Sequence, residues 1–195
     1  MLIKKYFPSL IGFDVFKKHS ELEDKLFNKC LKVMKQTSKG ASNWVSEDTY
    51  NTLGTYNFFN DNTFKTLNKF IIDSIKKYCD ELQIDKSKLN LKINDAWFNY
   101  YRKGDYQEFH IHQSALSVVY LLKGPVDGGR INFKTPLNPM SIIPFKNFSE
   151  DTYRSLFFDV VPGTLLIFDS SLEHSVSKHN VFEPRVTLAA NIYKK

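Results

Sequence analysis

Residues 104–122 read GDYQEFHIHQSALSVVYLL, and this stretch decides the fold. It holds two short candidate strands, Tyr106–His112 and Leu116–Leu122, and each has the length and the aromatic and β-branched residues of a β-strand. The turn residues Lys103-Gly104-Asp105 precede the first run. Short apolar runs of the same kind lie on both sides, so the whole chain after Lys88 is expected to form β-structure.

Eight short strands are expected after Lys88, separated by turns such as Asp127-Gly128-Gly129 and Pro162-Gly163. They are Leu91–Tyr101, Tyr106–His112, Leu116–Leu122, Arg130–Phe133, Phe157–Val161, Thr164–Phe168, His174–Ser177 and Val186–Tyr193. Many short strands with regular turns are typical of a jelly roll, or double-stranded β-helix. The expected fold is therefore mainly β, with helices at the N-terminal end.

The first 88 residues have a helical pattern. Ser20 can cap a helix that runs to Gly40, with apolar residues at helical spacing, and a second helix is expected over residues 62–82. Leu2–Phe16 is broken by proline and glycine, which predicts an edge strand and a turn. Cys30 and Cys79 occupy apolar positions of the two helices, which predicts buried free thiols.

A chain of 195 residues with 42% hydrophobic residues can bury one good core, so one domain is expected over residues 1–195. Residues 1–88 would form its helical support, and residues 89–195 its double-stranded β-helix core. Residues 135–155 contain three prolines and are expected to form a long surface loop. In an enzyme, such a loop often acts as a lid or contacts the substrate.

The net charge is +6, but the lysines are scattered along the two helices, where they form an ordinary solvated face. No stripe of aromatic and basic residues accompanies them, so a nucleic-acid surface is not expected. The N-terminus lacks the apolar segment of a signal peptide, and no stretch has the length of a membrane span. The sequence predicts a cytoplasmic protein.

The pair His110 and His112 carries the expected chemistry. Alternate side chains of a strand share a face, so both imidazoles point to one side of the sheet. Two imidazoles on one face can bind a metal, and a third ligand from a distant strand completes a facial set. His174, after the strand Thr164–Phe168, is the expected third ligand. The plain alternative is that these are half-buried strand histidines that satisfy polar positions.

Several motifs around these histidines resemble those of the 2-oxoglutarate/Fe(II) oxygenase superfamily, over residues 91–193. The closest likeness is to short bacterial and phage members with an H-x-H motif. Asn99-Tyr100-Tyr101-Arg102-Lys103-Gly104-Asp105-Tyr106 is similar to the N-x-Y-x-x-G-x-Y lead-in, and Arg185 follows His174 by eleven positions. The remaining similar segments are the strands Ser117–Leu122, Gly128–Phe133 and Pro162–Phe168.

The resemblance implies Fe(II) held by His110, His112 and His174, with 2-oxoglutarate as cosubstrate and dioxygen as oxidant. It implies oxidative decarboxylation of 2-oxoglutarate to succinate and CO₂, coupled to oxidation of a small-molecule or peptidyl substrate. Arg185 would bind the distal carboxylate, for which a planar guanidinium is the best partner. The expected cradle around this carboxylate also contains Thr187, Tyr101, Tyr120 and Asn99.

One departure affects this interpretation. Most of the superfamily has H-x-D, whereas here His112 stands at the carboxylate position, which leaves the iron site more positive. Two alternatives remain. A three-histidine cupin dioxygenase would fit the G-x₅-H-x-H spacing from Gly104, but Leu116 and Ser117 stand where its glutamate would be expected. A jelly-roll module with a metal but no turnover is the other. The oligomeric state stays open, a homodimer included.

Overall fold

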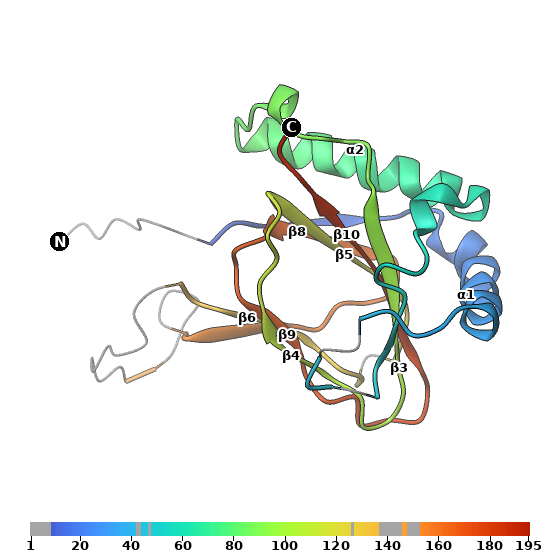
Figure 1. Ribbon diagram of the computed structural model, residues 1–195. Coiled ribbons are helices and arrows are strands. Elements are labelled where there is room, and N and C mark those ends of the chain that lie inside the picture. Colours follow the sequence, from blue (N-terminus) through green and yellow to red (C-terminus); the bar gives the residue numbers. More distant parts are fainter. Residues whose placement is uncertain (1–8, 42–43, 47, 126, 137–145, 148–152) are drawn as a thin grey trace.

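The computed structural model describes residues 9–41, 44–46, 48–125, 127–136, 146–147 and 153–195. Two antiparallel sheets face each other, and helices α1 (His19–Gln36) and α2 (Lys65–Glu81) cover the outer face of the larger sheet (Figure 1). Short 3₁₀ turns flank these helices at Phe58–Asn60, Asn62–Phe64 and Lys86–Lys88. The expected class, a mainly β jelly roll with N-terminal helices, is confirmed.

The larger sheet has six strands in the order β1-β8-β5-β10-β3-β2, all antiparallel. Their bounds are Ile11–Val15 (β1), Thr164–Asp169 (β8), Leu116–Lys123 (β5), Arg185–Ile192 (β10), Asp95–Tyr101 (β3) and Tyr50–Asn51 (β2). The smaller sheet has the order β4-β9-β6-β7. Its strands are Gln107–His110 (β4), His174–Val176 (β9), Ile131–Lys134 (β6) and Ser155–Phe158 (β7). Each expected strand after Lys88 has a counterpart among these.

Helix α1 differs from the expected one at both ends. It begins at His19, so Ser20 lies inside its first turn and makes no capping bond there. It ends at Gln36, because Thr37 already has an extended backbone, although its N–H still donates to the Val33 carbonyl. The expected end at Gly40 was therefore late.

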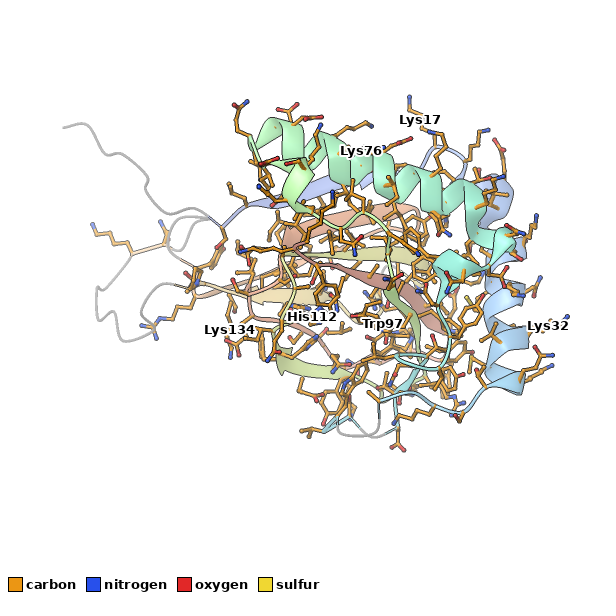
Figure 2. The ribbon with its side chains drawn as sticks, turned by 45° about the horizontal axis from the view of Figure 1, so that its top comes forward. Lys17, Lys32, Lys76, Trp97, His112 and Lys134 are labelled. Atoms are coloured by element: carbon orange, nitrogen blue, oxygen red, sulfur yellow. The ribbon has the colours of Figure 1, made fainter. Side chains whose placement is uncertain are left out.

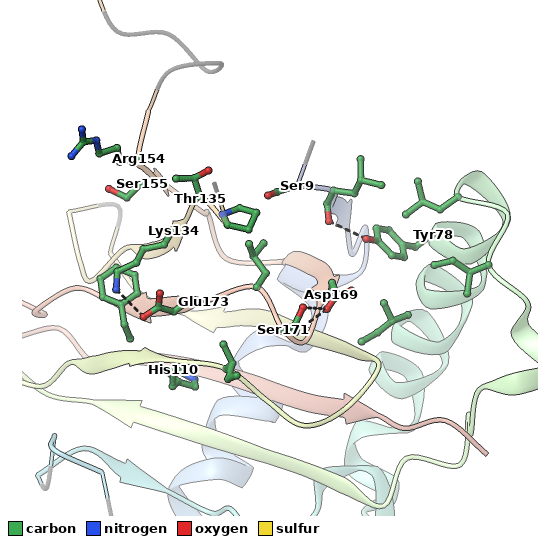
Figure 3. Close-up of a pocket in the computed structure, with 18 residues that line it drawn as sticks. Ser9, Tyr78, His110, Lys134, Thr135, Arg154, Ser155, Asp169, Ser171 and Glu173 are labelled. Atoms are coloured by element: carbon green, nitrogen blue, oxygen red, sulfur yellow. Dashed lines mark hydrogen bonds and ion pairs between the residues drawn. The ribbon is translucent and has the colours of Figure 1, made fainter. Parts of the chain in front are cut away.

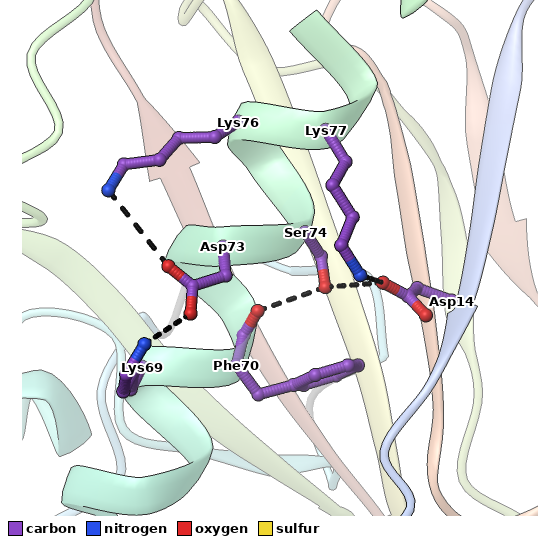
Figure 4. A network of polar contacts seen from close by, with 7 residues as sticks. All are labelled: Asp14, Lys69, Phe70, Asp73, Ser74, Lys76 and Lys77. Atoms are coloured by element: carbon purple, nitrogen blue, oxygen red, sulfur yellow. Dashed lines mark hydrogen bonds and ion pairs between the residues drawn. The ribbon is translucent and has the colours of Figure 1, made fainter. Parts of the chain in front are cut away.

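The N-terminal part is more than a helical support, because β1 and β2 form the two edges of the larger sheet. The edge strand expected within Leu2–Phe16 is β1, while residues 1–8 lie outside the described part of the chain. Asp14 of β1 also joins α2. Its Oδ2 lies 2.8 Å from the Ser74 hydroxyl and 3.3 Å from the Lys77 Nζ (Figure 4). These contacts hold the edge strand and the helix together.

The two faces of β5 have different environments. Leu116, Val118, Tyr120 and Leu122 point toward the helices and belong to the main apolar core. Ser117 and Val119 alternate with them and point into the space between the two sheets. Cys30 and Cys79 are fully buried in the helix-side core and form no disulfide, as expected.

The expected surface loop over residues 135–155 connects β6 to β7, which pair as neighbours. Residues 137–145 and 148–152 of this loop lie outside the described residues, so its expected role as a lid or substrate contact stays a prediction. Among the helices that the structure describes, none combines the length and apolar character that crossing a membrane requires.

Candidate metal centre

Three histidines meet between the two sheets. His110 ends β4, His112 follows it, and His174 begins β9, where it pairs directly with His110. Their candidate ligand atoms all lie within 4.8 Å of one another. In Figure 2, His112 lies in the interior with Trp97, while Lys17, Lys32 and Lys76 point outward. The strand alternation that the sequence predicts is present, since Phe109 and Ile111 are exposed.

The hydrogen bonds of these histidines leave one nitrogen of each ring for a metal. Nδ1 of His110 lies 2.8 Å from the Glu108 carbonyl oxygen, and Nδ1 of His174 lies 2.9 Å from the Leu172 carbonyl oxygen. Nδ1 of His112 lies 2.7 Å from Oδ1 of Asn191. Carbonyl oxygens only accept, so each Nδ1 carries a proton and each Nε2 keeps its lone pair. In this tautomer, Nε2 of each ring is free to bind a metal.

Burial keeps the three imidazoles neutral. Loss of solvation lowers the pKa of His110 and His112, and the same cause lowers the pKa of His174 to about 3, with a further effect of His110. Neutral imidazole is the form that binds metals. At neutral pH the cluster is therefore three uncharged donors with no proton to displace, which fits a divalent transition metal.

Glu108, which shares the strand face of the two histidines, binds elsewhere. Its carboxylate accepts hydrogen bonds from the Val45 N–H at 2.9 Å and from the Ser46 hydroxyl at 3.1 Å. Burial opposes ionisation of Glu108, but hydrogen bonds from its own backbone, Val45 and Ser46 outweigh it and lower the pKa. The carboxylate is thus occupied away from the three imidazoles.

Arg185 is a buried cation with free hydrogen-bonding capacity. It is 2% exposed, and its Nη1 has no hydrogen-bond partner among the described residues. The guanidinium lies over the Tyr101 ring, 5.2 Å from the ring centroid. Burial lowers the pKa of Arg185, and it raises that of Tyr101 to about 12. An unpaired buried charge is costly, so this geometry fits an anionic ligand such as a carboxylate.

Asn99 and Thr187 lie next to this cation on the inner face of the larger sheet. In the register of β3 and β10, Tyr101 is opposite Arg185, and Asn99 is opposite Thr187. The Asn99 Nδ2 donates to the Thr187 hydroxyl at 3.2 Å. The structure therefore brings these four expected cosubstrate residues together.

Tyr120 is a correction to the expected site. It points to the helix side of β5, where its hydroxyl lies 2.8 Å from Nδ1 of His19. Strand side chains alternate, so an assignment that is wrong by one residue changes the face. Leu121, opposite Thr187 in the register, has the parity of the inner face instead.

The sequence interpretation missed Asn191, Ser117 and Asp95. Ser117 Oγ and Asn191 Oδ1 are 3.0 and 2.7 Å from Nδ1 of His112, and Asn191 also binds Asp95. A signal was present in the sequence, because Asn191 has the same strand parity as Arg185 and Thr187. A polar residue at that parity, near the end of an apolar strand, indicates the inner face.

A groove of about 1250 Å³ opens beside His110 (Figure 3). Its walls combine apolar side chains, such as Ile111 and Leu172, with charged ones. Among the charged ones, Lys134 Nζ lies 2.7 Å from Glu173 Oε1 and 4.1 Å from the centroid of the Phe109 ring. Through His110, the groove places a space large enough for an organic substrate next to the histidine cluster.

Comparison with known proteins assigns the family. A family profile described as "Putative 2OG-Fe(II) oxygenase" matches residues 95–191, which span about half of the chain and contain every residue of the histidine cluster and the arginine site. The chain belongs to the 2-oxoglutarate/Fe(II) oxygenase superfamily. Members are 2-oxoglutarate-dependent oxygenases, the enzyme class that the sequence motifs indicated. No protein with a curated description matches this oxygenase.

Solved structures share the fold of this oxygenase at low sequence identity. A Pseudomonas putida prolyl-4-hydroxylase has a TM-score of 0.66 and 13% identity, covering 96% of this chain and 94% of its own. The epimerase SnoN, solved with Fe³⁺, alpha ketoglutarate and nogalamycin RO, has 0.63 and 12%, covering 95% and 79%. A Trichoplax adhaerens prolyl hydroxylase, solved with a hypoxia inducible factor peptide fragment, has 0.60 and 13%, covering 92% and 83%.

Proposed function

We propose that this oxygenase hydroxylates a small-molecule or peptidyl substrate and couples that reaction to decarboxylation of 2-oxoglutarate. His110, His112 and His174 would hold Fe(II), which supplies the activation of dioxygen when it is bound. The observation that carries the proposal is Arg185, a buried guanidinium whose Nη1 has no partner among the described residues. The distal carboxylate of 2-oxoglutarate is an anion of the right kind to bind there.

The protein's own residues would bind and orient the reactants. Arg185 binds the distal carboxylate, and the buried Tyr101, whose high pKa keeps its hydroxyl protonated, donates a hydrogen bond to the same group. Asn99 and Thr187 complete the polar wall on the inner sheet face. The two sheets exclude water from the cosubstrate, while the groove beside His110 admits the substrate.

The proposal covers two kinds of substrate, a small molecule and a peptide. Among the structures with the same fold, SnoN was solved with nogalamycin RO and the Trichoplax enzyme with a peptide. Both are similar to this chain in fold, and that fold accommodates substrates of either kind. The buried arginine favours a 2-oxoglutarate enzyme over a cupin dioxygenase, which has no need of an anion site for a cosubstrate.

Iron content and succinate formation test the proposal. We expect the full-length protein to form succinate from 2-oxoglutarate in an iron-dependent reaction. His112→Ala should weaken iron binding well beyond tenfold, because it removes a ligand. Glu108→Ala, four residues earlier in the chain, is the matched control and should stay within a few-fold, because that carboxylate binds Val45 and Ser46.

Each other outcome indicates a different function. Oxygen uptake that needs iron but not 2-oxoglutarate would favour the cupin reaction. Iron binding without any succinate would favour a module that binds metal and does not turn over. Parental iron affinity in the His112→Ala variant would remove this histidine from the site, and loss of iron in Glu108→Ala would assign the ligand to the glutamate.

A further inference from the structure

We propose that Asn191 is a positioning residue for His112 and that it connects this histidine to the carboxylate of Asp95. The inference rests on the proposed function, since it takes His112 as an iron ligand. It concerns the position at which this chain has histidine where most of the superfamily has aspartate.

The three side chains form a continuous chain of hydrogen bonds. Asn191 is 8% exposed and lies on β10, directly opposite Asp95 of β3 in the strand register. Its Oδ1 lies 2.7 Å from Nδ1 of His112, and its Nδ2 donates to Oδ2 of Asp95 at 2.7 Å. The Tyr193 hydroxyl donates to the same carboxylate oxygen at 2.9 Å. The carboxylate is thereby held in place from two sides.

The chemistry of these groups determines the direction of each bond. A carboxylate only accepts, so Asn191 must turn its NH₂ group toward Asp95 and its carbonyl oxygen toward His112. That oxygen also only accepts, so Nδ1 of His112 must carry the proton. Asp95 thus sets the tautomer of His112 through the intervening amide, and Nε2 is left as the metal-binding atom.

His112 needs this support more than the other two histidines do. Nδ1 of His110 and of His174 each binds the main-chain carbonyl two residues earlier, at Glu108 and Leu172. Such a bond follows from the backbone and survives most substitutions. The described partners of Nδ1 in His112 are the side chains of Asn191 and Ser117. Its orientation therefore depends on side-chain identity.

The same chain of hydrogen bonds places the negative charge of Asp95 close to the metal site. An aspartate ligand would bring a carboxylate into direct contact with the metal, whereas histidine brings none. Asp95 supplies a carboxylate two hydrogen bonds away, and it polarises the amide, which in turn strengthens the imidazole as a ligand. In place of an aspartate ligand, the chain thus has a neutral imidazole that is connected to the Asp95 carboxylate through the Asn191 amide.

Cobalt titration of the metal-free, full-length protein tests this, with the visible absorption of bound Co²⁺ as the readout. Asn191→Leu removes both amide bonds and should weaken cobalt affinity by about tenfold to a hundredfold, with a changed spectrum. Asp95→Asn keeps the geometry but removes the charge, so it should weaken affinity less. The double variant D95N/N191D rebuilds the chain with the carboxylate one bond nearer to His112. It should recover parental affinity or exceed it.

Two comparisons separate positioning from packing. Asn51→Leu is the matched control, since Asn51 is a fully buried asparagine whose amide binds the backbone of Ala41, away from the histidines. It should lower the melting temperature without changing cobalt affinity or the spectrum. Melting temperatures of all variants are measured in parallel, because a purely structural role for Asn191 would change only that quantity.

The outcomes distinguish this inference from the proposed function. Parental cobalt affinity and spectrum in Asn191→Leu, with affinity lost in His112→Ala, would refute the role of Asn191 and leave the metal site standing. A double variant as weak as Asn191→Leu would also overturn the inference, since the rebuilt chain of bonds would then have no effect. A parent protein that binds no cobalt would contradict both this inference and the proposed metal site.

Discussion

Arg185 carries a permanent charge into the space between the two sheets, where the Tyr101 ring faces it. Nη1 of Arg185 has no hydrogen-bond partner among the described residues, and burying an unpaired polar or charged group is costly, so an apolar residue of similar volume should be more stable at this position. We expect Arg185→Met to raise the free energy of unfolding of the ligand-free protein by about 1 kcal/mol or more, the cost of a buried donor without a partner. The KM for 2-oxoglutarate should rise at least about tenfold, because a charge-assisted hydrogen bond contributes about 1.5–3 kcal/mol.

Urea unfolding and steady-state kinetics measure the two effects of Arg185→Met. Arg185→Lys should restore little affinity, because the planar pair of donors is lost. Arg102→Met, at an exposed arginine next in the chain to Tyr101, is the control and should change neither quantity. An unchanged KM in Arg185→Met would show that the cosubstrate binds elsewhere.

The alternating side chains of strand β5 contact the metal centre on one face of the sheet and helix α1 on the other. Its inner face carries Ser117 beside His112, and its outer face carries Tyr120 beside His19 of α1. Tyr120→Phe removes the hydroxyl, so it should lower the free energy of unfolding by about 0.5–1.5 kcal/mol and leave the KM for 2-oxoglutarate unchanged. Tyr101→Phe, in contrast, should raise the KM for 2-oxoglutarate. A raised KM in Tyr120→Phe would contradict the helix-side position of this tyrosine.

The same alternation explains how much could be predicted from the sequence. The pairing of His110 and His112 on one face follows from the two-residue repeat of a strand alone, so it could be predicted from the local sequence. Tyr120 was wrong because a resemblance between motifs does not determine strand register to one residue. Asn191 was missed because its role depends on Asp95, which is 96 positions earlier in the chain. The end of α1 was misplaced because Thr37, not Gly40, leaves the helical conformation.

For the molecule as a whole, we propose that residues 1–195 unfold as one domain, and acid should weaken it. Burial lowers the pKa of His174 from 6.5 to about 3. The unfolded chain therefore gains a proton at this residue as the pH falls through 6.5, while the folded chain does not. The contribution of His174 to the free energy of unfolding is fully present above pH 6.5 and decreases as the pH falls from 6.5 toward 3. At about pH 5 the loss for this group is about 2 kcal/mol.

Urea unfolding of chelator-treated protein at about pH 7 and about pH 5 measures this loss. His174→Asn, which cannot titrate, should show a smaller difference between the two conditions by about the same 2 kcal/mol. An equal pH dependence in the parent and the variant would mean that His174 is protonated without cost in the folded state.

Strand β10 lies between β5 and β3, in the interior of the six-stranded sheet. During translation, the sheet cannot close until residue 192 has left the ribosome, although β3 and β5 emerge much earlier. Until then, the edges of β3 and β5 that pair with β10 have no partner, and exposed strand edges can pair with other chains. His110 and His112 are synthesised before Arg185 and Asn191, so a metal ion can bind the two histidines before the cosubstrate site exists. Expression at low temperature or with chaperones should therefore improve the yield of folded protein.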